Sequence, residues 1–346
     1  MQAQVLVTGG TGFIGRHLVR LLLERNQAVR VLCRCESKAV ELFGAEVEIF
    51  RGDLLDARSV DRACVEISHV FHVGGAYCFG LRNRRELMAA NVTGTRHVLE
   101  SAWKHGVEKV VHVSSASLFG GGSEGAARSN GFPLRPIIGG HYKKSKWLAE
   151  LCAREWADRG LPVSIASPTC PIGPGDEKPT PTGRMILDFL RGRFPAISRT
   201  GLNFISARDL AEGLVAVSQR GRKGESYVLG HRNMWLGEFL EILARHTGLP
   251  MPRVTLPWPL IAAAGLLGEV AGLFSAKRGQ RLCWETAWHA REVYFPDLSG
   301  VSDELGWRAR EPIEEAARCA ADWFQESMAA PRWPGKEVPL DNVLAH

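Results

Sequence analysis

Tyr142 and Lys146 stand one helical turn apart in the stretch GGHYKKSKWLAE, residues 139–150. On a helix both side chains project from one face, about 6 Å apart along the axis. A buried ammonium near a phenol favours the phenolate and lowers a phenol pKa that starts at about 10. The pair could therefore serve as an acid/base near neutral pH, although the same spacing also occurs on ordinary amphipathic helices.

Ser115 ends the apolar run KVVHVSS, residues 109–115, and so emerges at the end of a predicted strand. There its hydroxyl could hold a substrate oxygen beside a cofactor, because ligands of doubly wound sheets sit at the carboxyl ends of the strands. Lys146 could in addition donate to cofactor ribose hydroxyls. Together with Ser115 and a cofactor at the same sheet edge, the Tyr142 and Lys146 pair indicates an acid/base role more strongly than its spacing alone does.

Glycines follow the first predicted strand, QVLVTG, on the spacing GxxGxxG in TGGTGFIG. Glycine permits the tight turn, lets the backbone approach a pyrophosphate and allows the next helix to pack closely on the sheet. At the first strand of a βαβ series this pattern predicts a dinucleotide site. We expect the cofactor to contact the residues of this turn, which are Gly9, Thr11, Gly12, Phe13, Ile14 and Gly15.

The second predicted strand ends at Cys33 and Arg34, where a carboxylate for the 2′-hydroxyl of NAD would otherwise stand. A guanidinium instead suits a 2′-phosphate, to which it can donate two charge-assisted hydrogen bonds. We therefore expect NADP to be favoured over NAD, with Lys38 as a second contact.

Two further strand ends carry candidate cofactor contacts. Asp53 in GDLLD could accept from the adenine amino group, and the glycines of HVGGA, residues 72–76, let the backbone pass close to the cofactor. Both stretches are equally compatible with ordinary turns. The expected contacts outside the glycine turn and the second strand are Asp53, Leu54, Val73, Gly74, Tyr142, Lys146 and Pro168.

These residues need a scaffold of alternating strands and helices, and the first half of the chain predicts one. Short β-branched runs are expected as strands at 4–9, 28–33, 46–52, 69–75, 109–115 and 163–169, with helices at 15–26, 59–67, 91–106 and 141–160 between them. This alternation indicates an α/β fold with a doubly wound parallel sheet.

After Pro168 the stretch PTCPIGPGDEKPTPTGRM predicts a long loop, followed by a helix RMILDFLRG, a strand and helix in LNFISARDLAEGLVAVSQ, and mostly helices from Leu236. We expect residues 1–169 to form the dinucleotide-binding domain, with 202–230 returning to it. A smaller, mainly helical substrate lobe would comprise 170–201 and 231–330, and 331–346 a loosely attached tail.

Composition narrows the function classes. The 346 residues carry a net charge of +6 without a Lys/Arg block interleaved with aromatic residues, so nucleic acid is not an expected partner. The eight cysteines contain no CxxC pair, which indicates reduced thiols and no metal site. The N-terminus has no signal-peptide pattern, and we expect a cytoplasmic protein.

The stretch LPWPLIAAAGLLGEVAGLFSAKR, residues 256–278, is apolar from Leu260 to Phe274 apart from Glu269. It is too short and too interrupted to span a bilayer. We prefer to interpret it as a buried helix of the lobe. The alternative is peripheral contact with the inner membrane face, with Lys277, Arg278 and Arg281 at the headgroups.

The ordered combination of TGxxGxxG, GDLLD, HVGGA, NVTGT, a strand ending in two serines and YxxxK resembles the extended short-chain dehydrogenase/reductase family over nearly the whole chain. The resemblance implies a catalytic triad of Ser115, Tyr142 and Lys146, with Asn91 of NVTGT supporting the site. It also implies a homodimer formed through helices at about 91–105 and 142–158.

Downstream, PIGPGDEKPTPTGRMILDFL and GLNFISARDLAEG most closely resemble the hopanoid-associated sugar epimerase group, which is similar to dihydroflavonol reductases and 3β-hydroxysteroid dehydrogenases. Nucleotide-sugar epimerases of the family carry an asparagine where this chain has Cys170, three residues before Gly173. Sugar dehydratases carry an Asp-Glu pair where this chain has Ala116 and Ser117. Arg208, in SARD instead of HVDD, is a further departure from the group.

These departures favour oxidoreduction of a secondary alcohol or ketone on a hydrophobic polycyclic or isoprenoid small molecule. A 3β-hydroxysterol dehydrogenase/decarboxylase of sterol C4 demethylation, and hence of lipid metabolism, is one such function. The alternatives are a hopanoid-associated nucleotide-sugar epimerase and a non-catalytic subunit that binds the dinucleotide without turnover.

Overall fold

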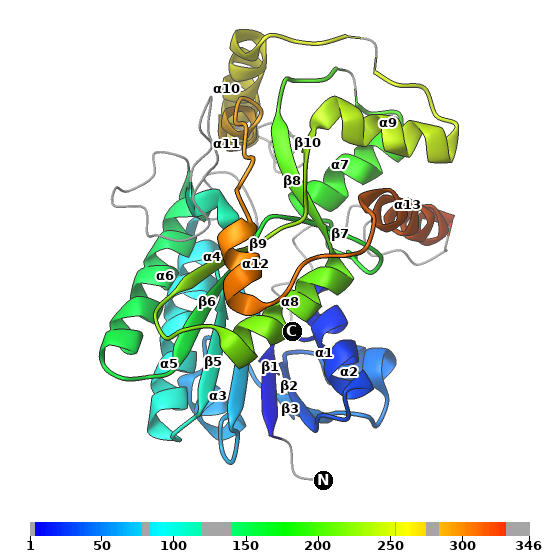
Figure 1. Cartoon of the computed structure of the whole chain (residues 1–346). Coiled ribbons are helices and arrows are strands. Elements are labelled where there is room, and N and C mark those ends of the chain that lie inside the picture. Colours follow the sequence, from blue (N-terminus) through cyan, green and yellow to red (C-terminus); the bar gives the residue numbers. More distant parts are fainter. Residues whose placement is uncertain are drawn as a thin grey trace.

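The computed structural model describes residues 4–77, 84–119, 140–194, 196–252, 254–274 and 284–329 (Figure 1). A seven-stranded parallel sheet forms its centre, in the order β3-β2-β1-β4-β5-β6-β9. The chain order reverses between β1 and β4, and ligands bind outside the carboxyl ends of the strands at such a switch point. The strands are β1 (Val5–Thr8), β2 (Val29–Cys33), β3 (Glu48–Arg51), β4 (His69–His72), β5 (Lys109–Val113), β6 (Val163–Pro168) and β9 (Ser226–Leu229).

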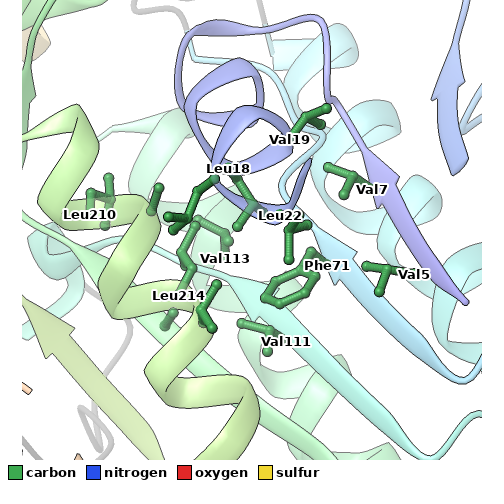
Figure 2. Close-up of a cluster of buried hydrophobic side chains, with 14 of the residues drawn as sticks. Val5, Val7, Leu18, Val19, Leu22, Phe71, Val111, Val113, Leu210 and Leu214 are labelled. Carbon is green, nitrogen blue, oxygen red and sulfur yellow. The ribbon is translucent and has the colours of Figure 1, made fainter. Parts of the chain in front are cut away.

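Helices cover both faces of this sheet, as the doubly wound prediction requires. One face packs against α1 (Phe13–Glu24), α2 (Glu36–Phe43), α8 (Ala207–Arg220) and α12 (Ser299–Leu305). Figure 2 shows the apolar side chains of α1 and α8 meeting those of β1, β4 and β5 in this layer. The other face packs against α3 (Ala57–Ala63), α5 (Gly94–Lys104) and α6 (His141–Asp158). Because both faces are covered, the strands are nearly continuous apolar runs.

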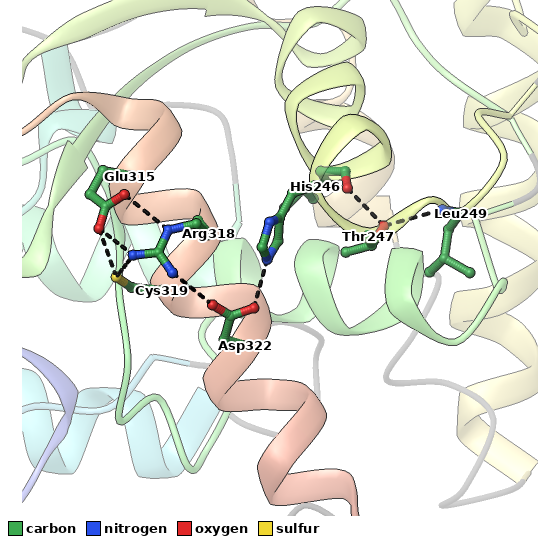
Figure 3. Close-up of polar contacts among 8 residues, drawn as sticks. His246, Thr247, Leu249, Glu315, Arg318, Cys319 and Asp322 are labelled. Carbon is green, nitrogen blue, oxygen red and sulfur yellow. Dashed lines mark hydrogen bonds and ion pairs between the residues drawn. The ribbon is translucent and has the colours of Figure 1, made fainter.

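A smaller lobe is built on a three-stranded sheet of β10 (Arg232–Trp235), β8 (Gly201–Ser206) and β7 (Cys170–Ile172). Its core also includes α7 (Pro181–Leu190), α9 (Leu236–Thr247) and α13 (Ile313–Ala329). The end of α9 is joined to α13 by a contact of 2.6 Å between His246 Nε2 and Asp322 Oδ1 (Figure 3).

The predicted long loop after Pro168 is wrong in two places. Cys170–Ile172 forms β7, because its backbone pairs in parallel with β8, Cys170 opposite Phe204. The following helix α7 begins at Pro181, where Thr180 accepts a hydrogen bond from the Gly183 amide and Pro181 occupies the first turn. The sequence interpretation also missed α2. Of the predicted return segment, β8 pairs in the smaller sheet, whereas β9 pairs in the large one.

The apolar stretch forms α10 (Trp258–Phe274), which packs against α11 (Trp284–His289) at one end of the molecule (Figure 1). The preferred interpretation of a buried helix is wrong, because Leu260, Leu266 and Leu267 are 57%, 56% and 71% exposed. No helix within the described residues is long and apolar enough to cross a membrane. The predicted tail and the cations Lys277, Arg278 and Arg281 lie outside the described residues.

Candidate functional site

The turn after β1 brings backbone segments into closer approach than side chains would allow. Gly9 has φ +72°, and a Cβ there would lie 2.6 Å from the Cα of Gly74. A Cβ on Gly15 would lie 2.1 Å from the carbonyl oxygen of Gly9. Helix α1 then starts at Phe13 and Ile14 after Gly12, with no side chain capping its first turn. Uncapped amides at a helix N-terminus beside a glycine cradle fit a dinucleotide pyrophosphate, with Thr11 in the same turn.

The loop after β4 lies directly beside this turn. The Val73 amide donates to the Thr8 carbonyl over 3.2 Å, and the Gly74 amide donates to the Thr8 hydroxyl over 3.2 Å. A Cβ on Gly74 would lie 2.8 Å from the Leu54 side chain, so Leu54 borders the same region.

Asp53 uses one carboxylate oxygen within its own turn, because Oδ1 accepts a hydrogen bond of 2.9 Å from the Leu55 amide. Pro168 is buried at the carboxyl end of β6.

The cations predicted for the 2′-phosphate lie at the end of β2 and on α2. Arg34 is exposed and makes no hydrogen bond or ion pair in the described part of the chain. Lys38 is already paired, since its Nζ lies 2.7 Å from Glu177 Oε2. Glu177 also pairs with Arg16 of α1. The loop after β7 thus supplies a counter-ion that sequence reasoning missed, because Lys38 and Glu177 are 139 residues apart.

Helix α6 holds Tyr142 and Lys146 in a buried environment, 5% and 8% exposed respectively. The Lys146 ammonium donates to the Val113 carbonyl at the end of β5 over 3.0 Å. Burial lowers the pKa of Lys146 to about 8, while the Glu150 carboxylate acts in the opposite direction. The Tyr142 ring lies 4.3 Å, centroid to centroid, from the ring of Tyr77, which the sequence did not single out.

Ser115 follows the same strand end that receives Lys146. Its Oγ lies 2.9 Å from Ser117 Oγ and accepts a longer hydrogen bond of 3.3 Å from the Ser117 amide. A short 3₁₀ helix, Ala116–Phe119, fixes this geometry. The structure therefore brings Lys146 and Ser115 together at the carboxyl end of β5, with Ser117 as an additional hydroxyl.

Asn91 lies in a π-helical turn, Ala89–Thr93, which joins α4 (Arg84–Met88) to α5. Its Oδ1 accepts from the Ala76 amide over 2.7 Å, and its Nδ2 donates to the Ala76 carbonyl over 3.0 Å. The same Nδ2 donates over 2.9 Å to Ser145 Oγ, which donates to the Tyr142 carbonyl. The amide thus joins the loop after β4 to the helix that carries Tyr142.

A buried hydrogen-bond chain leads from the glycine loops to Asn91. Thr95 Oγ1 donates to the Asn91 carbonyl, so it can only accept from His72 Nε2, 2.9 Å away. His72 Nδ1 is then free to accept from Thr8 Oγ1 over 2.8 Å. This arrangement requires a neutral imidazole with the proton on Nε2. Burial lowers the pKa of His72 to about 3, and the Lys146 charge acts in the same direction.

Cys170, the first residue of β7, and Tyr294 are neighbours within the lobe. Burial raises the pKa of the Cys170 thiol to about 11, so it stays neutral. Burial also raises the pKa of Tyr294, with Cys170 acting in the same direction, and its hydroxyl has no hydrogen-bond partner among the described residues. Sequence spacing cannot reveal this neighbourhood, since it depends on how the lobe folds back. Arg208 is exposed on α8 and makes no polar contact in the described part of the chain.

An ion pair joins the lobe to α6. Lys143, next to Tyr142, is 2% exposed, and its ammonium lies 2.8 Å from Glu292 Oε1. Within the described ranges, no group of three or more His, Cys, Asp or Glu side chains could hold a metal ion.

Comparison with known proteins extends these observations. A model of the NAD dependent epimerase/dehydratase family matches residues 5–230. A Synechocystis protein provisionally named dihydroflavonol 4-reductase is 38% identical, covering 92% of this chain and 94% of its own. Sterol demethylase protein B of Methylococcus capsulatus is 35% identical, covering 93% of this chain and 98% of its own. The crystal structure of gox2253 superposes with a TM-score of 0.80 at 34% identity, covering 94% and 98%.

Proposed function

The chain belongs to the NAD dependent epimerase/dehydratase family of extended short-chain dehydrogenases/reductases, and within it we propose an NAD(P)-dependent oxidoreductase of a hydrophobic secondary alcohol or ketone. One observation carries the proposal. The buried Lys146 ammonium is bonded to the end of β5, one turn from Tyr142 on α6 and at the strand end from which Ser115 emerges. This arrangement supports acid/base work on a hydroxyl group rather than dinucleotide binding alone.

In the proposed reaction, the Tyr142 phenolate takes the proton of the substrate hydroxyl while Ser115 holds its oxygen. The carbinol carbon becomes a carbonyl carbon by giving up a hydride, which bound nicotinamide accepts. Lys146 stabilises the phenolate. Asn91 holds α6 against the loop that follows β4 through its three hydrogen bonds. The reverse direction uses the same groups, with Tyr142 returning the proton.

A residue of the lobe and one relative favour a hydrophobic substrate. Cys170 presents a neutral thiol where nucleotide-sugar epimerases carry an asparagine, which removes a polar contact for a sugar diphosphate. The similarity to sterol demethylase protein B favours a polycyclic alcohol. With a 3β-hydroxysterol that carries a C4 carboxylate, oxidation at C3 gives a β-keto acid. That acid loses CO2 without any further catalytic group, so the site would act as a dehydrogenase/decarboxylase.

Turnover assays with sterol and triterpenoid alcohols, and with UDP-sugars, test this proposal. We expect reduction of NAD(P)+ with a polycyclic alcohol and a loss of about 100-fold or more in kcat for Tyr142→Phe, with NADPH binding unchanged in fluorescence titration. Conversion of a UDP-sugar without net cofactor reduction would favour the epimerase. Absence of turnover by the wild-type protein on both panels would favour the dinucleotide-binding subunit.

Accumulated lipids offer a test inside cells. If Tyr142→Phe replaces the wild-type protein, mass spectrometry should find a sterol or triterpenoid intermediate that accumulates. An unchanged lipid profile, together with altered sugar nucleotides, would contradict the proposed substrate class but not the proposed roles of Ser115, Tyr142 and Lys146.

We also propose NADP as the preferred cofactor, because Arg34 is an exposed cation at the end of β2, where a carboxylate for the 2′-hydroxyl of NAD would otherwise stand. Arg34→Ala should weaken NADPH binding about 10-fold, the loss expected for a charge-assisted hydrogen bond, and leave NADH binding unchanged. Glu177→Gln should strengthen NADPH binding, because it frees Lys38 from its counter-ion. Arg159→Ala, at the far end of α6, is the matched control. A wild-type protein that binds NADH more tightly than NADPH would contradict the proposal.

We also propose that the protein forms a homodimer through α5 and α6. Trp103 of α5 is 49% exposed and lies 6.0 Å, ring to ring, from Trp156 of α6. This aromatic pair would contact the second copy, and light scattering of the intact protein should give the mass of a dimer.

A further inference from the structure

Helix α10 presents an apolar face to the outside of the molecule. Leu260, Ala263, Ala264 and Leu267 recur at spacings of three and four residues, so they share one face of the helix. All four are exposed, and Leu267 reaches 71%. Glu269 is the only charged residue in the 17 residues of the helix. An exposed face of this size without charge is unusual on a soluble surface and marks an interaction site.

A tryptophan cluster stands where α10 meets α11. The Trp258 indole donates to the Ala287 carbonyl over 3.2 Å, and its ring lies 6.3 Å from that of Trp288. Trp284 is 41% exposed and lies 5.9 Å from Trp288. The Arg291 guanidinium covers two of these rings, 4.2 Å from Trp288 and 5.2 Å from Trp258. Tryptophan beside a cation is the combination that proteins place at the boundary between acyl chains and headgroups.

The sequence that flanks the helix carries a net positive charge, which complements an acidic membrane surface. Between Arg253 and Arg291 the sequence contains five basic residues and two acidic ones. The basic residues are Arg253, Lys277, Arg278, Arg281 and Arg291, and the acidic residues are Glu269 and Glu285. Basic residues that are near an apolar helix in the sequence favour its binding to anionic lipid headgroups, and the described one, Arg291, lies against the tryptophans of α10 and α11.

We propose that α10 is a membrane-docking helix that lies in the interfacial plane of a bilayer containing anionic phospholipids. Leu260, Leu266 and Leu267 insert among the acyl chains, while Trp284 and Arg291 stay at headgroup level. The helix projects from one end of the molecule (Figure 1), so docking leaves the large sheet clear of the lipid. This inference goes beyond the proposed function and does not depend on which alcohol is oxidised, although an isoprenoid substrate would dissolve in the same bilayer.

Vesicle co-sedimentation of the full chain, without substrate or cofactor, tests the proposal. The probes are vesicles of phosphatidylcholine alone and of phosphatidylcholine with phosphatidylglycerol. We expect binding to the anionic vesicles that salt weakens, and a partition coefficient at least about 10-fold lower for the double variant Leu266→Ser/Leu267→Ser. The matched control is Val40→Ser/Val65→Ser, which changes two valines that are also exposed (54% and 41%) but lie far from α10. The control should bind as the wild-type protein does.

Three results would overturn the proposal. The wild-type protein could fail to sediment with either kind of vesicle, or the leucine variant could sediment as the wild type does. Light scattering could also show that the leucine variant alone changes from dimer to monomer, in which case a second copy of the chain covers α10. Circular dichroism and thermal unfolding of both double variants establish that they are folded before binding is compared.

Discussion

At the residue scale, burial decides which protonation states the site can hold. His72 and His112 lie on neighbouring strands under the loop that follows β4, with ring centroids 5.4 Å apart. Burial lowers the pKa of His112 well below its usual range, and the Lys146 charge acts in the same direction. Both imidazoles are therefore neutral in the native state, whereas in the unfolded chain they take up protons near pH 6.5.

This difference predicts acid sensitivity. Below pH about 6.5 the unfolded state binds protons that the native state does not, so the free energy of unfolding falls as pH falls. Each such histidine contributes about 1.4 kcal/mol per pH unit. His112→Leu should reduce the dependence of the unfolding free energy on pH by the contribution of one histidine. The substitution costs no hydrogen bond, because neither ring nitrogen of His112 has a partner among the described residues. Urea unfolding between pH 7 and 5 measures the slopes. An equally reduced slope for the control His231→Gln would refute the assignment.

At the element scale, the glycine turn works because two loops share a space that side chains would fill. The approach of Gly9 to Gly74 brings the ends of β1 and β4 together at the switch point of the sheet, and the approach of Gly15 to Gly9 brings α1 against the end of β1. The atoms in contact are backbone atoms, so they cannot move aside as a flexible side chain would. Cofactor binding and the packing of α1 therefore depend on the same glycines.

Gly9→Ala should consequently destabilise the protein by about 1–3 kcal/mol and abolish dinucleotide binding, since the residue needs both φ +72° and the missing Cβ. Gly237→Ala is the matched control. Gly237 lies in α9 with no atom within 4 Å of an added Cβ, so alanine should leave stability unchanged or raise it by up to about 1 kcal/mol. Urea unfolding and NADPH titration give the two readouts. Similar behaviour of the two variants would contradict this account.

At the scale of the whole molecule, the lobe is linked to α6 by the buried charge of Lys143. Lys143 belongs to α6, and Glu292 follows α11. The Glu292 carbonyl also accepts from the Gly201 amide of β8 over 3.2 Å. Glu292 therefore connects α6 to the small sheet through two contacts, and it lies just after α11, which packs against α10.

Glu292→Gln leaves the Lys143 ammonium buried without its carboxylate, and we expect a loss of about 3–5 kcal/mol in unfolding free energy. Adding Lys143→Met should restore most of that loss, because the uncompensated charge is then gone. Asp61→Asn, which removes the surface carboxylate paired with Lys104 and His105, should cost at most about 1 kcal/mol. The comparison requires urea unfolding of all four proteins. A double variant no more stable than Glu292→Gln would show that geometry, not charge, makes this link.

Local pattern was enough to predict the strand series, the glycine turn and the placement of Ser115 at the end of β5 and of Tyr142 and Lys146 on α6. These features are encoded within a few residues of each other, by β-branched runs, by glycine spacing and by one turn of helix. The family resemblance rests on the same stretches. The Pro and Gly content after Pro168 predicted a loop where β7 and the start of α7 are found. Pairing with β8 and the Thr180 cap outweigh composition in this stretch.

Only the tertiary structure decided what surrounds these residues. Glu177 beside Lys38, Tyr294 beside Cys170 and Glu292 beside Lys143 each join parts of the chain that are more than 100 residues apart. The apolar stretch of α10 has the composition of a buried helix, yet Leu260, Leu266 and Leu267 are exposed because no other described element of the lobe covers them. Sequence determines which side chains are available and the local turns that present them. Which side chains are buried, which have a counter-ion and which are exposed depends on the distant segments that pack together. Burial and counter-ions then decide the protonation states of the site, and exposure decides which surfaces can bind a partner.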